Sequence, residues 1–164
     1  MILEEIAGRR STRDFKEEAV SEKEIAEVIK AGQFAPSSRN NRAIEYVVIT
    51  EKALKDKIGE AVSQPFVKAA PALIIPVTDP ASSMQPVQDL SVASENIFLQ
   101  AEALGLGTVW KNVSPEAMQE VAPIIGVPRN LLFINIIPVG HPKTKLPPHT
   151  DAEFDAKKLH QEKW

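Results

Sequence analysis

The chain has 164 residues, of which 43% are hydrophobic and 25% charged, and its formal net charge is −3. This length fits one domain, residues 1–164, and the composition is that of a globular protein with a sizeable core. The acidic balance argues against broad nucleic-acid binding, and the absence of cysteine excludes disulfides, thiolate metal sites and a cysteine nucleophile. We therefore expect a cytoplasmic protein whose basic sites are local.

The start of the chain does not resemble a secretion signal. Glu4 and Glu5 stand where such a signal is basic, and no long apolar run follows them. The apolar segment 131–140 is interrupted by Asn135 and Pro138 and is shorter than the roughly 20 residues of a membrane span. We expect no association with membranes.

Two helices are predicted first. Apolar residues at helical spacing indicate a short helix over residues 2–8, which ends at Gly8, a residue suited to the left-handed conformation of a helix stop. Ser21 and Glu24 form a capping box, and the apolar stripe that follows predicts a helix to about Gln33. An Ala-Pro pair then ends this second helix.

Strands and helices follow in the middle of the chain. The β-branched run 46–49 predicts a buried strand, residues 52–62 a charged helix, and residues 72–77 a second strand. The stretch 89–104 reads as a long, central helix. Its predicted apolar face consists of Leu90, Ala93, Ile97, Ala101 and Leu104.

The last third begins with a Gly-Leu-Gly stop at 105–107, and residues 108–110 are expected to be extended. Ser114 as N-cap and Pro115 at the first helical position predict a helix to about residue 125. Residues 131–139 are predicted to form a strand. Without regular βαβ alternation, these elements favour an α+β arrangement with helices around one sheet. A Rossmann sheet is not favoured, because the glycine pair follows a helix rather than a strand.

Three arginines lie within five residues in the stretch Arg-Arg-Ser-Thr-Arg, residues 9–13. One interpretation is a surface patch, because cations directly after a helix are stabilised by the helix dipole. The stretch is also a weak match to a basic kinase site. The other is a phosphate site, because forked guanidinium groups and hydroxyls are strong donors to an anion. A second basic pair, Lys143 and Lys145, follows the last predicted strand and could meet the first on one anion.

The loop after the second helix reads Ala-Pro-Ser-Ser-Arg-Asn-Asn-Arg, residues 35–42. Proline, serine and asparagine are the ordinary residues of turns, which is the simplest interpretation. The same side chains offer paired donors and acceptors suited to the edge of a flat heterocycle.

Four motifs in order carry a resemblance to a known family. They are Arg-Arg-Ser-x-Arg-x-Phe near the start, Ala-Pro-Ser-Ser-x-Asn before a strand, Ala-x-x-Leu-Gly-Leu-Gly-Thr after the long helix, and Gly-His-Pro-x-x-Lys near the end. Together they resemble the FMN-dependent nitroreductase family over residues 2–150. The resemblance implies a dimeric α+β fold with helices around one mixed, mainly antiparallel sheet.

The resemblance also implies roles for the two basic clusters. Arg9, Arg10 and Ser11 would bind the phosphate and ribityl chain of FMN, and Arg13 would lie beside flavin N1 and O2. A cation there stabilises the charge of the reduced ring. The family's second phosphate-binding segment contains Lys143 and Lys145, and which of the two contacts the anion is left open.

Further implied contacts lie in the loop and after the long helix. In the family this loop reaches the flavin of the partner subunit, which assigns Pro36, Ser37, Ser38 and Asn40 to a shared site. The backbone N–H of Asn112 falls where the family contacts flavin N5. His141, in the second phosphate-binding segment, is expected to be structural, and with no metal-ligand spacing among the histidines no metal is assigned.

The implied function is a homodimeric FMN oxidoreductase that takes hydride from NADH or NADPH and reduces a nitroaromatic, a quinone or a similar small acceptor by a ping-pong mechanism. No side chain is expected to act as acid, base or nucleophile, because the flavin performs the chemistry. Two alternatives stay open: a non-catalytic flavin- or nucleotide-binding sensor or store, and an unrelated domain that binds a phosphorylated partner. The family often has Gln-Pro-Trp after the loop, whereas this chain has Arg42, Ala43 and Ile44. The short chain also leaves little room for helices that form a lid over the flavin. The acceptor and the preferred nicotinamide are therefore not assigned.

Overall fold

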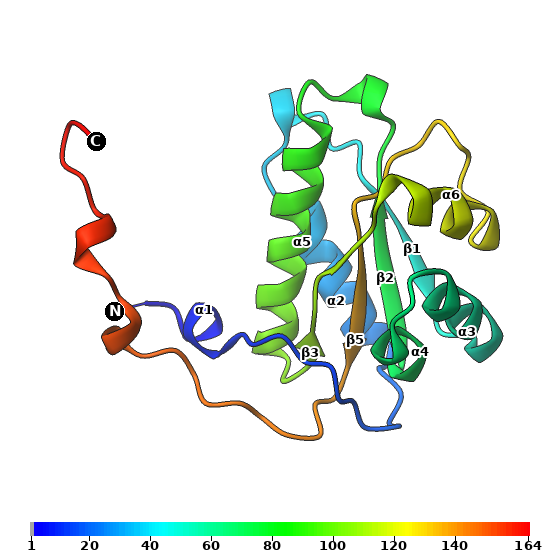
Figure 1. Ribbon diagram of the computed structural model, residues 1–164, viewed down its shortest axis with the longest axis horizontal. Coiled ribbons are helices and arrows are strands. Elements are labelled where there is room, and N and C mark those ends of the chain that lie inside the picture. Colours follow the sequence, from blue (N-terminus) through cyan, green and yellow to red (C-terminus); the bar gives the residue numbers. More distant parts are fainter. Residues whose placement is uncertain (1) are drawn as a thin grey trace.

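The computed structural model describes residues 2–164 and has a five-stranded sheet at its centre (Figure 1). The strands follow the order β1-β2-β5-β3, with β4 also paired to β5, and every pairing between them is antiparallel. The predicted α+β fold with one mainly antiparallel sheet is therefore confirmed. The bounds are β1 Glu45–Ile49, β2 Ala72–Val77, β3 Gly107–Thr108, β4 Lys111–Asn112 and β5 Asn135–Gly140.

Strands β3 and β4 are two ends of one segment that runs beside β5. Gly107 pairs with Gly140 and Asn112 with Asn135, so the register is the same at both ends although the ladder is interrupted between them. β5 begins four residues later than predicted from the apolar run. Before it, Leu132 forms a separate bridge to Thr78, with both backbone N–H groups donating across it at 2.8 and 2.9 Å.

Helices cover both faces of the sheet (Figure 1). On one side lie α2 and α5, which pack on Ile74, Ile137 and Val139; on the other lie α3, α4 and α6, which pack on the neighbouring residues Leu73 and Ile75. This alternation follows from the pleat of a strand, and β2 and β5 are consequently buried over their whole length. The helices are α1 Glu4–Gly8, α2 Glu22–Gln33, α3 Lys52–Ala61, α4 Pro65–Ala69, α5 Pro86–Ala103 and α6 Pro115–Ile124.

The local signals for helix starts are confirmed in two places. Ser21 and Glu24 form the reciprocal capping box of α2, and the Ser114 side chain accepts the N–H of Ala117 at the start of α6. α5 starts three residues earlier than predicted, with Pro86 at its first turn. No helix within residues 2–164 is both long and apolar enough to cross a membrane.

The C-terminal stretch 146–164, hereafter the arm, leaves the body of the molecule (Figure 1). All its residues are exposed, and its only helical pieces are two short 3-10 turns, Asp151–Glu153 and Ala156–Lys158. One backbone bond, from the His149 N–H to the Ala7 carbonyl at 2.8 Å, ties its beginning to α1.

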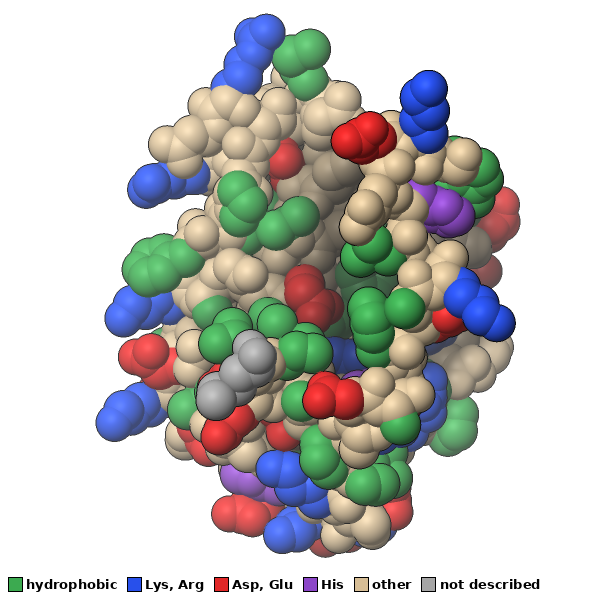
Figure 2. Space-filling view, turned by 90° about the vertical axis from the view of Figure 1, so that its left-hand side faces the viewer, with side chains coloured by type: hydrophobic (Ala, Val, Ile, Leu, Met, Phe, Trp, Pro, Cys, Tyr) green, Lys and Arg blue, Asp and Glu red, His purple; other side chains and the backbone are tan. Residues whose placement is uncertain are grey.

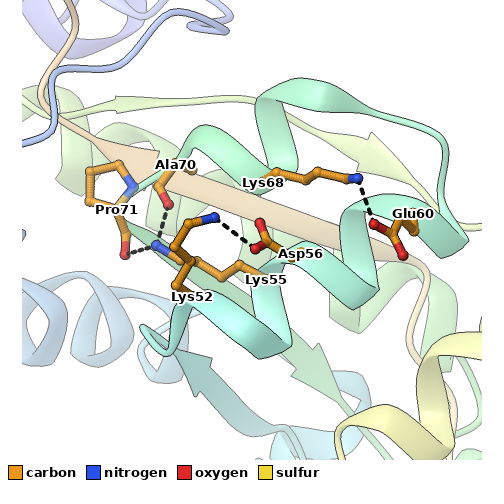
Figure 3. Close-up of polar contacts among 7 residues, drawn as sticks. All are labelled: Lys52, Lys55, Asp56, Glu60, Lys68, Ala70 and Pro71. Carbon is orange, nitrogen blue, oxygen red and sulfur yellow. Dashed lines mark hydrogen bonds and ion pairs between the residues drawn. The ribbon is translucent and has the colours of Figure 1, made fainter.

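A buried lysine fixes the short helix α4 (Figure 3). The sequence pattern did not predict this helix. Lys55 of α3 is only 9% exposed, and its Nζ donates to the carbonyls of Ala70 and Pro71 at 2.8 and 3.0 Å. These groups follow the last turn of α4, where helix carbonyls lack partners in the helix itself. Burial, with a smaller contribution from Lys52, lowers the pKa of Lys55.

Replacing Lys55 by methionine should lower the free energy of unfolding by about 1–3 kcal/mol, because one buried and one half-buried carbonyl lose a charged donor while the apolar stem is kept. Urea unfolding followed by circular dichroism measures the effect. Lys57→Met is the matched control, because Lys57 is exposed on the same helix. Equal stability of the two variants would contradict a bridging role for Lys55.

Candidate functional site

Backbone hydrogen bonds place the N-terminal basic segment beside the segment that follows β5. The Thr12 N–H donates to the carbonyl of Thr108 in β3 at 2.9 Å, and the Lys16 N–H donates to the carbonyl of His141 at 2.8 Å. The Lys143 N–H in turn donates to the carbonyl of Asp14 at 3.1 Å. The two basic clusters, more than 120 residues apart in the sequence, are therefore neighbours in the fold.

The glycine at the end of the Leu-Gly-Leu-Gly motif makes this approach possible. A Cβ at Gly107 would collide with the side chain of Thr12, so any other residue would push the two segments apart. Phe15 anchors the same segment: it is 4% exposed, forms a bridge with Pro142 and belongs to the core under β2.

Most cations of the two clusters already have a partner. Lys143 pairs with Asp14 at 2.9 Å, and Lys145 pairs with Glu102 at 3.4 Å. The Nη1 of Arg10 donates to the carbonyl of Pro147 at 2.6 Å. The Arg9 side chain has no hydrogen-bond or ion-pair partner within the described part of the chain and is half-buried.

Arg13 lies slightly apart from these cations. Its guanidinium carbon is 5.7 Å from the centre of the Phe66 ring in α4, a cation–π distance. Because Lys55 holds the end of α4, this short helix forms a fixed support for Arg13. Sequence reasoning missed Phe66, because α4 itself carries no periodic signal over five residues.

A hollow of about 570 Å³ opens beside the basic clusters (Figure 2). It lies between α1, the C-terminal end of α5 and the start of the arm, and Figure 2 shows this face of the molecule. Its polar lining includes Glu4, Glu5, Glu102, Lys145 and His149. A smaller hollow next to it is lined by Arg10, Thr12 and Lys145, among others.

The serine- and asparagine-rich loop lies at the opposite end of α5 (Figure 1). Its anchor is Asp89 in the first turn of α5, which is 6% exposed and accepts the Ser38 N–H at 2.9 Å. The other carboxylate oxygen of Asp89 accepts the Ser83 hydroxyl at 2.6 Å. No role for Asp89 was predicted from the sequence; an acidic residue in the first turn of a long helix was the available signal.

The loop backbone is held in an unusual conformation. Arg39, Asn40 and Arg42 have φ values of +53°, +54° and +50°, in the left-handed region that costs energy for residues other than glycine. Two contacts inside the loop keep it in place: the Ser37 hydroxyl accepts the Arg42 N–H, and the Asn40 side chain accepts Arg42 Nε, both at 3.1 Å. Pro36, near the start of the loop, is exposed.

The structure does not bring this loop to the basic clusters of the same chain. Asp89 and Glu102 mark the two places along α5, and at 1.5 Å per residue they lie roughly 20 Å apart along the helix axis. A single anion cannot contact both groups of residues within one chain.

Asn112 lies in β4, between these two regions. It is exposed, and its strand partner Asn135 is fully buried. The Asn135 amide donates to the Ser94 hydroxyl of α5 at 3.0 Å, and that hydroxyl donates to the Leu90 carbonyl at 2.7 Å. The position of Asn112 is thus fixed by a buried polar link between the sheet and α5.

Comparison with known proteins assigns the chain to a family. The sequence model of the nitroreductase family matches this chain in two overlapping stretches, residues 6–72 and 60–141. An Archaeoglobus fulgidus protein, named provisionally as an NADH dehydrogenase/NAD(P)H nitroreductase, is 33% identical over 170 residues, which cover 99% of this chain and 98% of that protein. An FMN reductase [NAD(P)H] of Bacillus subtilis is 25% identical over 86% of this chain and 66% of its own.

A solved structure agrees with these sequence matches. The FMN-dependent nitroreductase of Clostridium difficile R20291 superposes with a TM-score of 0.93 at 28% identity, covering 98% of both chains. The family match covers the first basic cluster, the loop, the whole of α5 and β5, and it ends at residue 141, before Lys143. On this evidence the chain belongs to the nitroreductase family.

Proposed function

We propose that this chain is a single-domain FMN flavoprotein, active as a homodimer, that oxidises NADH or NADPH and reduces a small acceptor such as a nitroaromatic or a quinone. The family membership and the NAD(P)H- and FMN-dependent relatives support an NAD(P)H-dependent oxidoreductase. The observation that carries the proposal for this chain is the meeting of its two basic clusters at one junction.

The residues at that junction fit the phosphate of FMN. The two segments that the backbone bonds hold together carry all the residues predicted to bind the phosphate. These residues are Arg9, Arg10, Ser11, Lys143 and Lys145. A phosphate accepts charged hydrogen bonds from guanidinium and ammonium groups, and the Arg9 side chain has no competing partner among residues 2–164. Asp14 and Glu102 form ion pairs with Lys143 and Lys145 and so orient these two lysines.

Bound FMN supplies the hydride chemistry, and the chain supplies position and charge. Arg13, supported by Phe66, would place a positive charge at the pyrimidine edge of the ring, where charge grows on reduction. Asn112, fixed through Asn135 and Ser94, would present its backbone to the reactive edge. No acid, base or nucleophile from the chain is required.

A second copy would complete the site. The loop that carries Pro36, Ser37, Ser38 and Asn40 lies roughly 20 Å away along α5 from the proposed phosphate site. We infer that it contacts the flavin of the partner subunit. Apolar side chains support such an assembly: Leu3, Ile6 and Phe34 are 65%, 48% and 73% exposed and line a hollow between α1, α2 and α5.

The arm supports the same assembly. Phe154 and Leu159 are 71% and 59% exposed, and the arm has no core of its own. We propose that it lies on the partner subunit, where these side chains would be covered. Contact of the arm's start with Arg10 would then couple dimer formation to the phosphate site.

Arg9→Ala should weaken FMN binding by about 1.5–3 kcal/mol, or roughly tenfold to a hundredfold, because one charged hydrogen bond to the phosphate is lost. Fluorescence titration of the flavin-free protein with FMN measures the affinity. Arg129→Ala is the control, since Arg129 is exposed in the turn after α6. Unchanged FMN affinity in Arg9→Ala would remove the phosphate assignment.

Mixing two damaged chains tests the shared site directly. Asn40→Gly removes the loop side chain at a positive φ that glycine adopts freely, and on its own it should weaken FMN binding. In a heterodimer of Arg9→Ala with Asn40→Gly, one site combines both defects and the other is intact. Purified heterodimers should therefore bind one FMN per dimer with the affinity of the unmodified protein.

Two weakened sites per heterodimer would instead place the loop and the basic clusters of one chain at the same flavin. The homodimers of each variant are the controls, because both of their sites carry one defect. Tagging the two chains differently and purifying through both tags isolates the heterodimer.

Catalysis is tested with NADH and NADPH in turn and a quinone or nitroaromatic acceptor. Because donor and acceptor would use the same position at the flavin, double-reciprocal plots at several acceptor concentrations should be parallel, as in a ping-pong reaction. Intersecting lines would show that both substrates bind together. A yellow protein that neither nicotinamide bleaches would favour the alternative of a flavin-binding sensor or store.

A further inference from the structure

Strand β4 has a free edge on the side that faces away from β5. Asn112 lies opposite Asn135 in the pairing of these two strands. The next residue, Val113, donates its backbone N–H to the Ile134 carbonyl at 2.9 Å. Because successive residues of an antiparallel strand turn their backbone groups to alternate sides, the N–H and C=O of Asn112 point away from β5.

A second bond, at the start of the same segment, agrees with this alternation. Thr108 of β3 has the same register with β5 as Asn112, and its carbonyl accepts the Thr12 N–H at 2.9 Å. The N-terminal basic segment thus occupies this edge at Thr108. At Asn112, which is exposed, no strand within residues 2–164 pairs with the edge.

The side chain of Lys111 reaches this free edge. Its Nζ donates to the Asn112 carbonyl at 2.7 Å. The N–H and the C=O of one strand residue point to the same side, so the ammonium group lies beside the N–H of Asn112. In the proposed function this N–H meets the reactive edge of the flavin.

The Lys111 ammonium group keeps most of its capacity to bind an anion. It has three N–H donors, of which one is used on the Asn112 carbonyl. No carboxylate pairs with Lys111 in the part of the chain that the structure covers. The side chain is half-buried, so solvent ions screen its charge less than that of a fully exposed lysine.

This cation is separate from those that would hold the FMN phosphate. The N-terminal basic segment joins the edge at Thr108, and at about 3.3 Å per residue Asn112 lies roughly 13 Å further along the strand. The ammonium group of Lys111, which is held at Asn112, therefore stands apart from the proposed phosphate site and can meet a second anion.

We propose that Lys111 is a specificity-determining residue, whose ammonium group binds an anionic substituent of the acceptor at the reactive edge of the flavin. This inference rests on the proposed function and narrows its acceptor to aromatic acids, such as a nitrobenzoate or a quinone carboxylate. A carboxylate on Lys111 holds the reducible group of such an acid close to the flavin, and a neutral acceptor lacks this contact. No acid or base from the chain enters the reaction.

The probes are 4-nitrobenzoate and 4-nitrobenzamide, which have nearly the same shape and differ in charge. Each is titrated into the oxidised, FMN-saturated full chain without NADH or NADPH, and binding is followed through the absorption spectrum of the flavin. We expect 4-nitrobenzoate to bind roughly tenfold more tightly than the amide, because it alone forms a charged hydrogen bond with Lys111. Turnover should show the same preference in kcat/KM.

Lys111→Gln should weaken 4-nitrobenzoate roughly tenfold and leave the affinity for 4-nitrobenzamide unchanged, because only the acid loses a charged hydrogen bond. Lys111→Arg should keep the preference for the acid, since the positive charge is retained. Lys57→Gln is the matched control: it removes the same charge from an exposed position on α3 and should leave both affinities unchanged. Retained FMN binding and an unchanged circular dichroism spectrum show that each variant folds.

If NADH or NADPH bleaches the flavin but the unmodified chain binds the acid and the amide equally, the role of Lys111 is overturned and the proposed function stands. Equal weakening of both ligands by Lys111→Gln would also overturn this role, because the lysine would then only hold β4 in place. Weaker binding of NADH or NADPH with an unchanged affinity for 4-nitrobenzoate would assign the ammonium group to the donor instead. A chain that binds no FMN would overturn the proposed function and this inference together.

Discussion

The short backbone ladder that joins residues 11–16 to β3 and to residues 141–143 is the constraint on which the site depends. Without it, the arginines after α1 and the lysines after β5 would be separate surface charges. The ladder exists because Gly107 and Phe15 allow and anchor the close approach of the two segments. Its bonds are between backbone groups, so the placement of the cations is largely independent of the cations themselves.

The helix α5 is the second constraint, because it fixes the distance between the basic clusters and the loop. Its buried face is packed against the sheet, with Leu90, Ala93 and Ile97 fully buried. Both of its ends hold segments of the candidate site through carboxylates, Asp89 at the loop and Glu102 at Lys145. Because this face of α5 is packed on the sheet, the two ends of the helix are held at a fixed separation.

Much of the fold could be predicted because its signals are local. The capping box of α2, the N-cap of α6 and the bounds of β2 need only neighbouring residues, and all three are confirmed. α4 could not be predicted, because a five-residue helix depends on a distant side chain, Lys55, for its last carbonyls. The start of β5 was placed too early for a similar reason: apolar character does not reveal that Leu132 bridges to Thr78 outside the ladder.

The chemical character of the candidate site residues could be predicted from the sequence, whereas their tertiary contacts could not. Motifs identify which residues carry charge and hydroxyls, but the roles of Asp89 and Phe66 arise only from tertiary contacts. The order of the motifs was informative because it carried the resemblance to the family, and the family assignment was confirmed. The folded chain adds the spacing between the motifs, which no linear pattern contains.

The roughly 20 Å between the loop and the basic clusters has a consequence for how the proposed dimer would behave on dilution. A cofactor gripped by two chains acts as a molecular cross-link, so its affinity and the monomer–dimer equilibrium become linked quantities. Loss of the cofactor would loosen the assembly, and separation of the subunits would in turn release the cofactor. Cellular abundance of the chain would then influence how much of it is loaded, even when the cofactor itself is plentiful.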